Sequence, residues 1–248
     1  MGKRILKKVA LIVFVLAMPL LIFSVSVRLV VNDLNVYNSG LVKYDIPRET
    51  GIALAELERV DRELVQYFNS NEEYLDIVLS TGVPLYNQKE ISHLKDVKDL
   101  VKLDYRLQWL TLAYVVGYAL IVLVWQRSGW RRALAGLGRT IMFGGGLTLT
   151  LMAILGLALF VAFDRVFLAF HLLGFSNLLW VLDPATDRLI QMFPQGFFYD
   201  AALRLAGITL VIALVVSVVG WGLELLQKKI DRYAIAAIIL NRNKGHGE

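Results

Sequence analysis

The residues best suited to chemistry in this chain are its histidines, of which there are three, whereas cysteine is absent. Without cysteine the chain has no thiolate nucleophile, iron–sulfur ligand or disulfide. His171 lies among apolar residues, where an ionisable side chain is costly and therefore a functional candidate. His93 lies in a charged stretch, with Asp96 three residues later on the same helical face. Both histidines are candidate general acids or bases near neutral pH. The alternatives are a solvated His93 and a His171 satisfied by a backbone carbonyl or by water.

Other familiar arrangements of reactive residues are missing from the sequence. The histidines show neither HxxxH nor HExxH spacing, so no metal site is predicted. Ser176 lacks the G-x-S-x-G elbow of serine hydrolases. The run Gly144-Gly145-Gly146 lies inside an apolar segment and predicts close helix packing rather than phosphate binding.

The elements that must hold these residues are predicted to be membrane-spanning helices. The chain is 57% hydrophobic and 19% charged, with a mean hydropathy of +0.58. Its apolar residues form four runs, at about 9–31, 107–125, 141–163 and 205–226. Each run is long enough to cross a hydrocarbon core of about 30 Å. We therefore predict an all-α membrane protein with four transmembrane helices. The spans contain almost no polar groups, which argues against a transporter or channel.

The distribution of charge predicts the topology. Half of the 26 Lys and Arg residues lie in the N-terminus, the 127–139 loop and the tail, and basic residues accumulate in cytoplasmic segments. We expect residues 1–31 to form the cytoplasmic N-terminus and the first span, and 32–106 an extracytoplasmic domain. Residues 107–163 would form the second and third spans, joined by the basic cytoplasmic loop 127–139. An outer interfacial segment at 164–204, the fourth span at 205–227 and a cytoplasmic tail on the inner leaflet at 228–248 would follow. Alternatively, the first span could be a cleaved signal peptide, but its length favours a retained anchor.

The two outer segments differ in character. Residues 52–68 have apolar positions at helical spacing, which predicts an amphipathic helix. Residues 74–87 suggest a short β-hairpin or an extended arm, and 90–105 a helix leading into the second span. Segment 164–204 is too apolar and aromatic for a solvated loop. It predicts short interfacial helices, one starting at Asp183-Pro184, and a cavity open to the outer leaflet.

Two strings in these outer segments carry a resemblance to a known family. They are EISHLKDVK at 90–98 and FHLLGFSNLLWVLDPATDRLI at 170–190, continuing to FPQGFF at 193–198. With four spans in this order, the chain resembles, over essentially its whole length, the bacterial membrane family that includes the lipoprotein intramolecular transacylases. It departs from the family pattern at Leu94 and Leu178, where methionine and an acidic residue are frequent.

The resemblance implies an intramolecular O-to-N acyltransferase. Such an enzyme moves the sn-2 acyl chain of a diacylglyceryl-cysteine to the α-amino group of that cysteine, which gives an N-acyl lyso-form lipoprotein. It implies no cofactor, and its partners would be diacylated bacterial lipoproteins and membrane lipid, with no nucleic acid. We expect a monomer in the bacterial cell membrane, with the active site at the extracytoplasmic face. A non-enzymatic protein that binds or scaffolds lipoproteins at the outer face is the alternative.

The resemblance places the catalytic pair at His93 and His171. We take His171 as the base and His93 as the group that orients or stabilises developing charge, although these roles could be reversed. The aromatic residues would line an acyl-chain pocket, with an interfacial aromatic belt as the alternative. The predicted substrate-binding residues are Asp96, Asn177, Trp180, Phe175 and Asp183.

Overall fold

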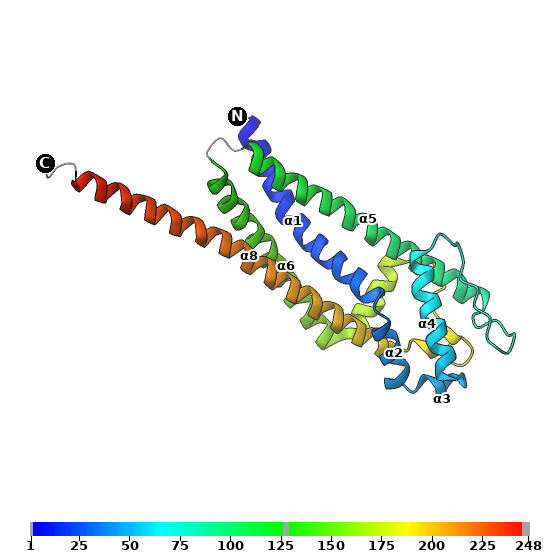
Figure 1. Cartoon of the computed structure of the whole chain (residues 1–248). Coiled ribbons are helices and arrows are strands. Elements are labelled where there is room, and N and C mark those ends of the chain that lie inside the picture. Colours follow the sequence, from blue (N-terminus) through cyan, green and yellow to red (C-terminus); the bar gives the residue numbers. More distant parts are fainter. Residues whose placement is uncertain (1, 126–128, 245–248) are drawn as a thin grey trace. The chain divides into compact units, whose positions relative to one another are not determined.

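The computed structural model of the chain describes residues 2–125 and 129–244, with the side chains of Lys3 and 231–244 left out. Its elements are helices (Figure 1). They are α1 (Gly2–Val31), α2 (Leu34–Lys43), α3 (Ile46–Thr50), α4 (Leu54–Asn69), α5 (Gln88–Trp125), α6 (Trp130–Gly174), α7 (Arg188–Met192) and α8 (Gln195–Lys244).

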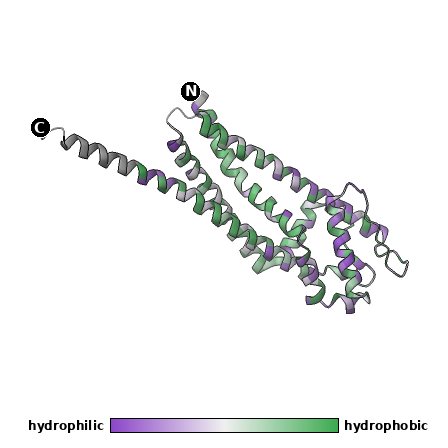
Figure 2. Cartoon of the chain, in the orientation of Figure 1, coloured by the Kyte–Doolittle hydropathy of each residue, from purple (hydrophilic) through white to green (hydrophobic). Residues whose placement is uncertain are grey.

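Four helices are long and apolar enough to cross a membrane, at Arg4–Val31, Gln88–Trp125, Trp130–Gly174 and Gln195–Ile230. Figure 2 shows hydrophobic residues along these helices and more hydrophilic residues on α4 and the start of α5. The prediction of an all-α protein with four membrane-spanning helices is thereby confirmed.

The helices extend beyond the spans predicted from the apolar runs, and the predicted membrane boundaries stay predictions. The basic segment 127–139 is helical from Trp130 onward, as the start of α6, and residues 127 and 128 lie outside the described part. Helix α6 continues beyond Phe163 to Gly174, across one non-helical residue, Ala162 (φ −147°, ψ 47°). Helix α8 begins at Gln195, ten residues before the predicted fourth span. The predicted placement of the tail on the inner leaflet concerns residues 228–248, of which the side chains from 231 onward lie outside the described part.

The chain divides into two compact units. The first comprises Met1–Ile22, Trp109–Met152 and Thr209–Glu248, and its core contains an apolar cluster of Phe14, Met18, Ile22, Leu137 and Ala213. There the ring of Phe14 packs 4.7 Å from that of Tyr118, and the hydroxyl of Tyr114 donates to the carbonyl of Ala10 at 2.8 Å. Thr148 and Thr209 are also buried in this unit. The apolar contacts must come from close steric fit, because lipid offers helices no hydrophobic drive to associate.

Glycines in the first unit allow that fit. A Cβ built on Gly144 would lie 2.5 Å from Cγ of Met18, and one on Gly145 would lie 2.2 Å from Oγ of Ser217. No atom approaches within 4 Å of the corresponding position on Gly146. The predicted packing role of the glycine run is therefore confirmed for Gly144 and Gly145.

This difference between adjacent glycines gives a stability prediction. We expect Gly145→Ala to destabilise the protein by about 1–3 kcal/mol, because a backbone shift must make room for the methyl group. Gly146→Ala should be neutral or slightly stabilising, because open space surrounds it and alanine favours helix. Thermal unfolding in detergent micelles measures both. Equal melting temperatures for the two variants would contradict the packing role.

The second unit comprises Phe23–Gln108 and Ala153–Ile208. Its core is built around α4, which buries Leu57, Val60, Leu64, Tyr67 and Phe68 on one face. The predicted amphipathic helix at 52–68 is thus confirmed. Segment 74–87 forms one isolated antiparallel bridge, between Val78 and Pro84, and no strand of its own. It is therefore an extended arm with an exposed tight turn, which Gly82 closes with φ of +81°, and Leu75, Ile77, Leu85 and Tyr86 anchor the arm in the core.

The predicted helix start at Asp183-Pro184 is wrong. The carbonyl of Asp183 instead accepts from the backbone N–H groups of Thr186 and Asp187, which closes a single turn. Helix α7 begins at Arg188, with Asp187 as its N-cap. An Asp-Pro pair suits a turn as well as a helix start, so the pair alone could not separate the two.

Candidate active site

The second unit brings the two candidate histidines together. His93 comes from the N-terminal part of α5, and His171 comes from the last turn of α6. Their ring centroids lie 6.4 Å apart, with an angle of 30° between the ring planes. Both are buried, with 6% and 8% of their surfaces exposed. Two buried imidazoles at this separation can act on one small reacting group held between or beside them.

Aromatic rings enclose the pair. Phe175 lies 5.0 Å from His93 and 5.6 Å from His171, measured between centroids. Trp180 and Phe167 lie 4.9 Å and 4.4 Å from His171. Of the predicted site residues, Phe175 and Trp180 therefore do lie beside the histidines. Such a surrounding excludes water and strengthens electrostatic interactions at the reacting atoms.

A hydrogen bond fixes the tautomer of His171. Its Nδ1 lies 2.8 Å from the carbonyl oxygen of Phe167. A carbonyl can only accept, so Nδ1 carries the proton and Nε2 of the neutral ring is left as an acceptor. A backbone carbonyl partner for His171 was predicted as the alternative to a functional role. That partner is present, yet it leaves one ring nitrogen of His171 available for proton transfer.

His93 is held differently. Its Nδ1 is buried and has no hydrogen-bond partner among the residues that the structure describes. A buried polar atom without a partner is uncommon, and one at a candidate site is available to a substrate group. Burial also disfavours the charged imidazolium.

Asn177 connects the two sides of the site. Its Nδ2 donates to Oδ2 of Asp96 at 2.8 Å, and its carbonyl accepts from Nε1 of Trp180 at 2.9 Å. Its own Oδ1 accepts from the backbone N–H of Leu179 at 3.0 Å. Asp96 and Asn177, both predicted to bind substrate, are thus bonded to each other and hold Trp180 in place over His171.

Exchanging these two side chains tests the connection. Asp96→Asn and Asn177→Asp should each lower activity by about tenfold, because the first places two amides opposite each other and the second two carboxylates. The double exchange restores one amide donor and one carboxylate acceptor. We expect it to recover most of the activity, as measured by the acyl-transfer assay described below. A double variant as impaired as the worse single variant would contradict this pairing.

Asp183, the remaining predicted site residue, is engaged in its own turn. Its carboxylate accepts from the backbone N–H of Ala185 at 2.9 Å, and its backbone N–H donates to Asp187 at 2.8 Å. The buried acids Glu90 and Asp187, which sequence reasoning did not select, lie at this edge of the site. The spacing of Asn87 and Glu90, a capping-box pattern, was the available signal for Glu90. No group of three His, Asp or Glu side chains suited to a metal occurs in the described part of the chain.

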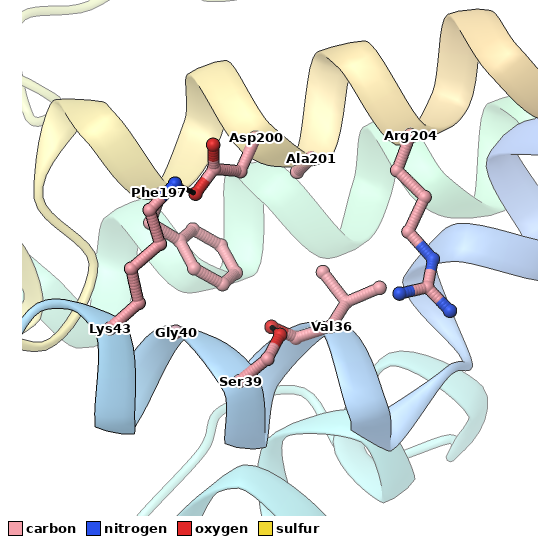
Figure 3. A pocket seen from close by; sticks show the side chains of 8 residues that line it. All are labelled: Val36, Ser39, Gly40, Lys43, Phe197, Asp200, Ala201 and Arg204. Carbon is pink, nitrogen blue, oxygen red and sulfur yellow. Dashed lines mark hydrogen bonds and ion pairs between the residues drawn. The ribbon is translucent and has the colours of Figure 1, made fainter.

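A shallow cavity of about 240 Å³ also lies in the second unit (Figure 3). Its wall includes the ion pair between Lys43 and Asp200, at 2.6 Å. The ring of Phe197 fits against Gly40, where a Cβ would lie only 2.6 Å from it. Phe197 contacts Phe198, which in turn packs 5.3 Å from Phe167 beside His171. The cavity wall and the histidine site thus share one aromatic framework.

The fold and the site together define an integral membrane protein with a buried histidine pair in an aromatic enclosure. Residues 12–198 match the family of the lipoprotein intramolecular transacylase Lit, and the chain belongs to that family.

Solved structures of Lit from Bacillus cereus share the fold. One has a TM-score of 0.73 at 22% identity and covers 94% of this chain and 100% of its own. Two others carry a histidine substitution. The variant with arginine has a TM-score of 0.70 at 21% identity, covering 94% and 96%, and the variant with alanine has 0.71 at 21%, covering 94% and 98%. An uncharacterized protein of Aquifex aeolicus is 25% identical over 154 residues, which is 60% of this chain and 62% of the relative.

Proposed function

We propose that this chain is a lipoprotein intramolecular transacylase. It would move the sn-2 acyl chain of a diacylglyceryl-cysteine to the α-amino group of that cysteine and leave an N-acyl lyso-form lipoprotein. The observation that carries the proposal is the pair of buried imidazoles, 6.4 Å apart and enclosed by aromatic rings, in a chain of the Lit family. The substituted histidine in two of the solved relatives supports a role for histidine in the family.

The chemistry suits a site without its own nucleophile. The substrate supplies both the amine and the ester, so the protein must hold them together, which makes the transfer intramolecular. The amine attacks the ester carbonyl, a carbon–nitrogen bond forms and the carbon–oxygen bond to glycerol breaks. One proton must leave the amine, and one must reach the departing glycerol oxygen. Two histidines can perform these transfers without a cofactor.

Nε2 of His171 is the better placed acceptor for the amine proton. Its Nδ1 is already held by the carbonyl of Phe167, and that bond survives when the ring becomes charged. His93 would then stabilise the oxyanion or protonate the leaving oxygen, using the ring whose Nδ1 has no partner in the protein. Phe175 and Trp180 would contact the acyl chain near the ester, while the Asp96–Asn177 pair holds this wall and Asp183 shapes its rim.

The setting of the reaction follows from the charge distribution. We place both termini in the cytoplasm and the histidine pair at the extracytoplasmic face, because the basic segments are short and the acidic ones contain the site. We expect a monomer in the bacterial cell membrane. The substrates are diacylated lipoproteins, and membrane lipid surrounds the spans.

Turnover tests the proposal. The purified protein is incubated in micelles with a synthetic diacylated lipopeptide, and the product is followed by tandem mass spectrometry. Transfer leaves the total mass unchanged, so the N-terminal fragment ions must gain the acyl group. A lipopeptide with an acetylated α-amino group is the control, because it cannot accept the acyl chain. Binding without any change in the fragments would instead favour the scaffold function.

A further inference from the structure

Two acidic residues outside the predicted site lie buried at its edge. Glu90 is 1% exposed and Asp187 is 5% exposed. They come from elements far apart in sequence, since Glu90 lies in the first turn of α5 and Asp187 caps α7. Buried carboxylates are retained only where hydrogen bonds compensate for their burial.

Both oxygens of Glu90 are used. Oε2 accepts from the backbone N–H of Asn87 at 2.7 Å, which closes the capping box of α5. Oε1 accepts from the backbone N–H of Leu189 at 2.6 Å, across 99 residues of sequence. The same carboxylate therefore starts α5 and attaches the first turn of α7 to it.

Asp187 makes the reciprocal connection. It accepts from Nδ2 of Asn87 at 2.9 Å and from Nζ of Lys89 at 3.3 Å, and it holds its own turn through the N–H of Asp183. Nζ of Lys89 also donates to the carbonyl of Val181 at 2.6 Å, one residue beyond Trp180. The C-terminal part of the loop that carries Trp180 is thus held to the start of α5.

His93 lies between two such attachments. Glu90 precedes it by three residues and Asp96 follows it by three, and at helical spacing all three side chains lie on one face. Asp96 binds Asn177 at the start of the loop, and Glu90 binds Leu189 after its end. Trp180 lies in the loop between these anchors, and Phe175 lies two residues before the first of them. The two attachments therefore hold the segment whose rings pack against the imidazoles.

We propose that Glu90, Asp187 and Lys89 form a clamp that positions the aromatic wall of the site against His93 and His171 during acyl transfer. These are positioning residues, since they act through Phe175 and Trp180 rather than on reacting atoms. The inference rests on the proposed function, and it names the part of the site that sets the geometry of the bound ester. A displacement of about 1 Å in such a wall can cost on the order of 100-fold in rate.

The chain offers a matched control for Glu90. Glu56 makes equally short bonds in the same unit, with both N–H and Oγ of Ser80 at 2.6 Å. It anchors the exposed turn of the arm at 74–87 to α4, as Glu90 anchors α7 to α5. Glu90→Gln and Glu56→Gln each replace one anchoring oxygen by an amide nitrogen. Glu56 is less buried than Glu90 and also pairs with Arg59 at 3.1 Å, so the melting temperatures of both variants are measured beside their kinetics.

The test compares kinetics with local hydrogen exchange. We expect Glu90→Gln to lower kcat by about 10- to 100-fold with KM within about twofold, and Glu56→Gln to leave kcat unchanged. Lys89→Met, at a partly exposed position, should lower kcat by about three- to tenfold without impairing folding. Amide exchange in residues 175–189 should accelerate in Glu90→Gln and not in Glu56→Gln.

The outcomes separate this inference from the proposed function. If the wild type transfers acyl chains and both Glu variants match it, the clamp has no positioning role. If both Glu variants lose kcat equally, Glu90 is merely structural. Faster exchange in Glu90→Gln with unchanged kcat also overturns the inference. A wild-type protein without turnover refutes the proposed function and with it a role in transfer, while exchange still shows whether the clamp holds the loop.

Discussion

Replacing His171 by alanine is expected to lower acyl transfer by on the order of 100- to 10,000-fold, the usual contribution of a general base. The variant loses Nε2, the proton acceptor, and it also loses the bond from Nδ1 to the carbonyl of Phe167. Initial rates from N-terminal fragment ions measure the effect. KM should change less than kcat, because the ring acts on the reacting atoms and the acyl chain is bound mainly by the surrounding aromatic residues.

A second substitution separates chemistry from structure. In His171→Asn the side-chain amide can still donate to the carbonyl of Phe167, while nothing replaces Nε2. We expect it to melt closer to the wild type than the alanine variant does and to be equally inactive. Activity in His171→Asn near the wild-type level would contradict the assignment of Nε2 as base.

The other two histidines complete this comparison. His93→Ala should also lose on the order of 100-fold or more, and the double variant should lose little beyond the worse single variant, because the two rings serve one step. His246→Ala, which changes the histidine of the polar C-terminal end, is the control and should retain wild-type activity. Full activity in His93→Ala would remove His93 from the mechanism and leave a single-histidine site.

Replacing Asp61 by asparagine is expected to stabilise the protein, and increasingly so as the pH rises. Asp61 in α4 is fully buried, and within the described part of the chain neither of its carboxylate oxygens has a hydrogen-bond partner. Desolvation, with a smaller contribution from the charge of Glu58, raises the pKa of Asp61 from 3.8 to about 7, and Arg62 opposes the shift. Burial raises the pKa values of Tyr37 in α2 and Tyr86 in the arm at 74–87, and the charge of Asp61 raises both further.

The sign of the pH dependence follows from linkage. The folded state keeps the proton on Asp61 to a higher pH than the unfolded state does. Stability contributed by this group is therefore complete below about pH 4, declines as pH rises and is lost above about pH 7. The full loss is at most about 4 kcal/mol, from 1.36 kcal/mol per pKa unit. The Asp61→Asn variant avoids this loss, because an amide side chain cannot ionise.

Chemical unfolding at pH 4.5 and pH 8 measures the effect. Asp61→Asn should lie close to the wild type at pH 4.5 and be more stable by a few kcal/mol at pH 8. The control is Glu63→Gln, which changes a carboxylate on the outer side of the same helix. Its stability difference from the wild type should not increase with pH in this way. If the free energies of unfolding of Asp61→Asn and the wild type differ by the same amount at both pH values, the raised pKa of the buried Asp61 carboxyl group is contradicted.

The elements that depend on local composition could be predicted from the sequence. The spans were visible as apolar runs, and the face of α4 as apolar residues at helical spacing. His93 and His171 were identified by residue type and by resemblance, but their 6.4 Å separation depends on how α5 and α6 pack, which spacing along the chain does not encode. Asp61 was overlooked although it follows Leu57 by four residues on the apolar stripe, where a carboxylate is conspicuous.

The remaining differences have similar physical causes. Asp183 was predicted to bind substrate and to start a helix, because Asp-Pro is compatible with several turns; only the contacts of Asp187 show which one forms. The bond from Leu189 to Glu90 joins residues 99 positions apart, so no local pattern reveals it. The break in α6 falls at Ala162, which is neither proline nor glycine, so the sequence does not reveal it.

Because of that break, the two imidazoles are carried by helices of different regularity. His93 belongs to α5, which is regular from Gln88 to Trp125, and its neighbours Glu90 and Asp96 are both bonded to other segments. His171 follows Ala162 by nine residues, on a short arm beyond the one irregular residue of α6. Bending in a helix concentrates at such an irregularity. A change in the distance between the rings is therefore expected to come from the part of α6 that follows Ala162 rather than from α5.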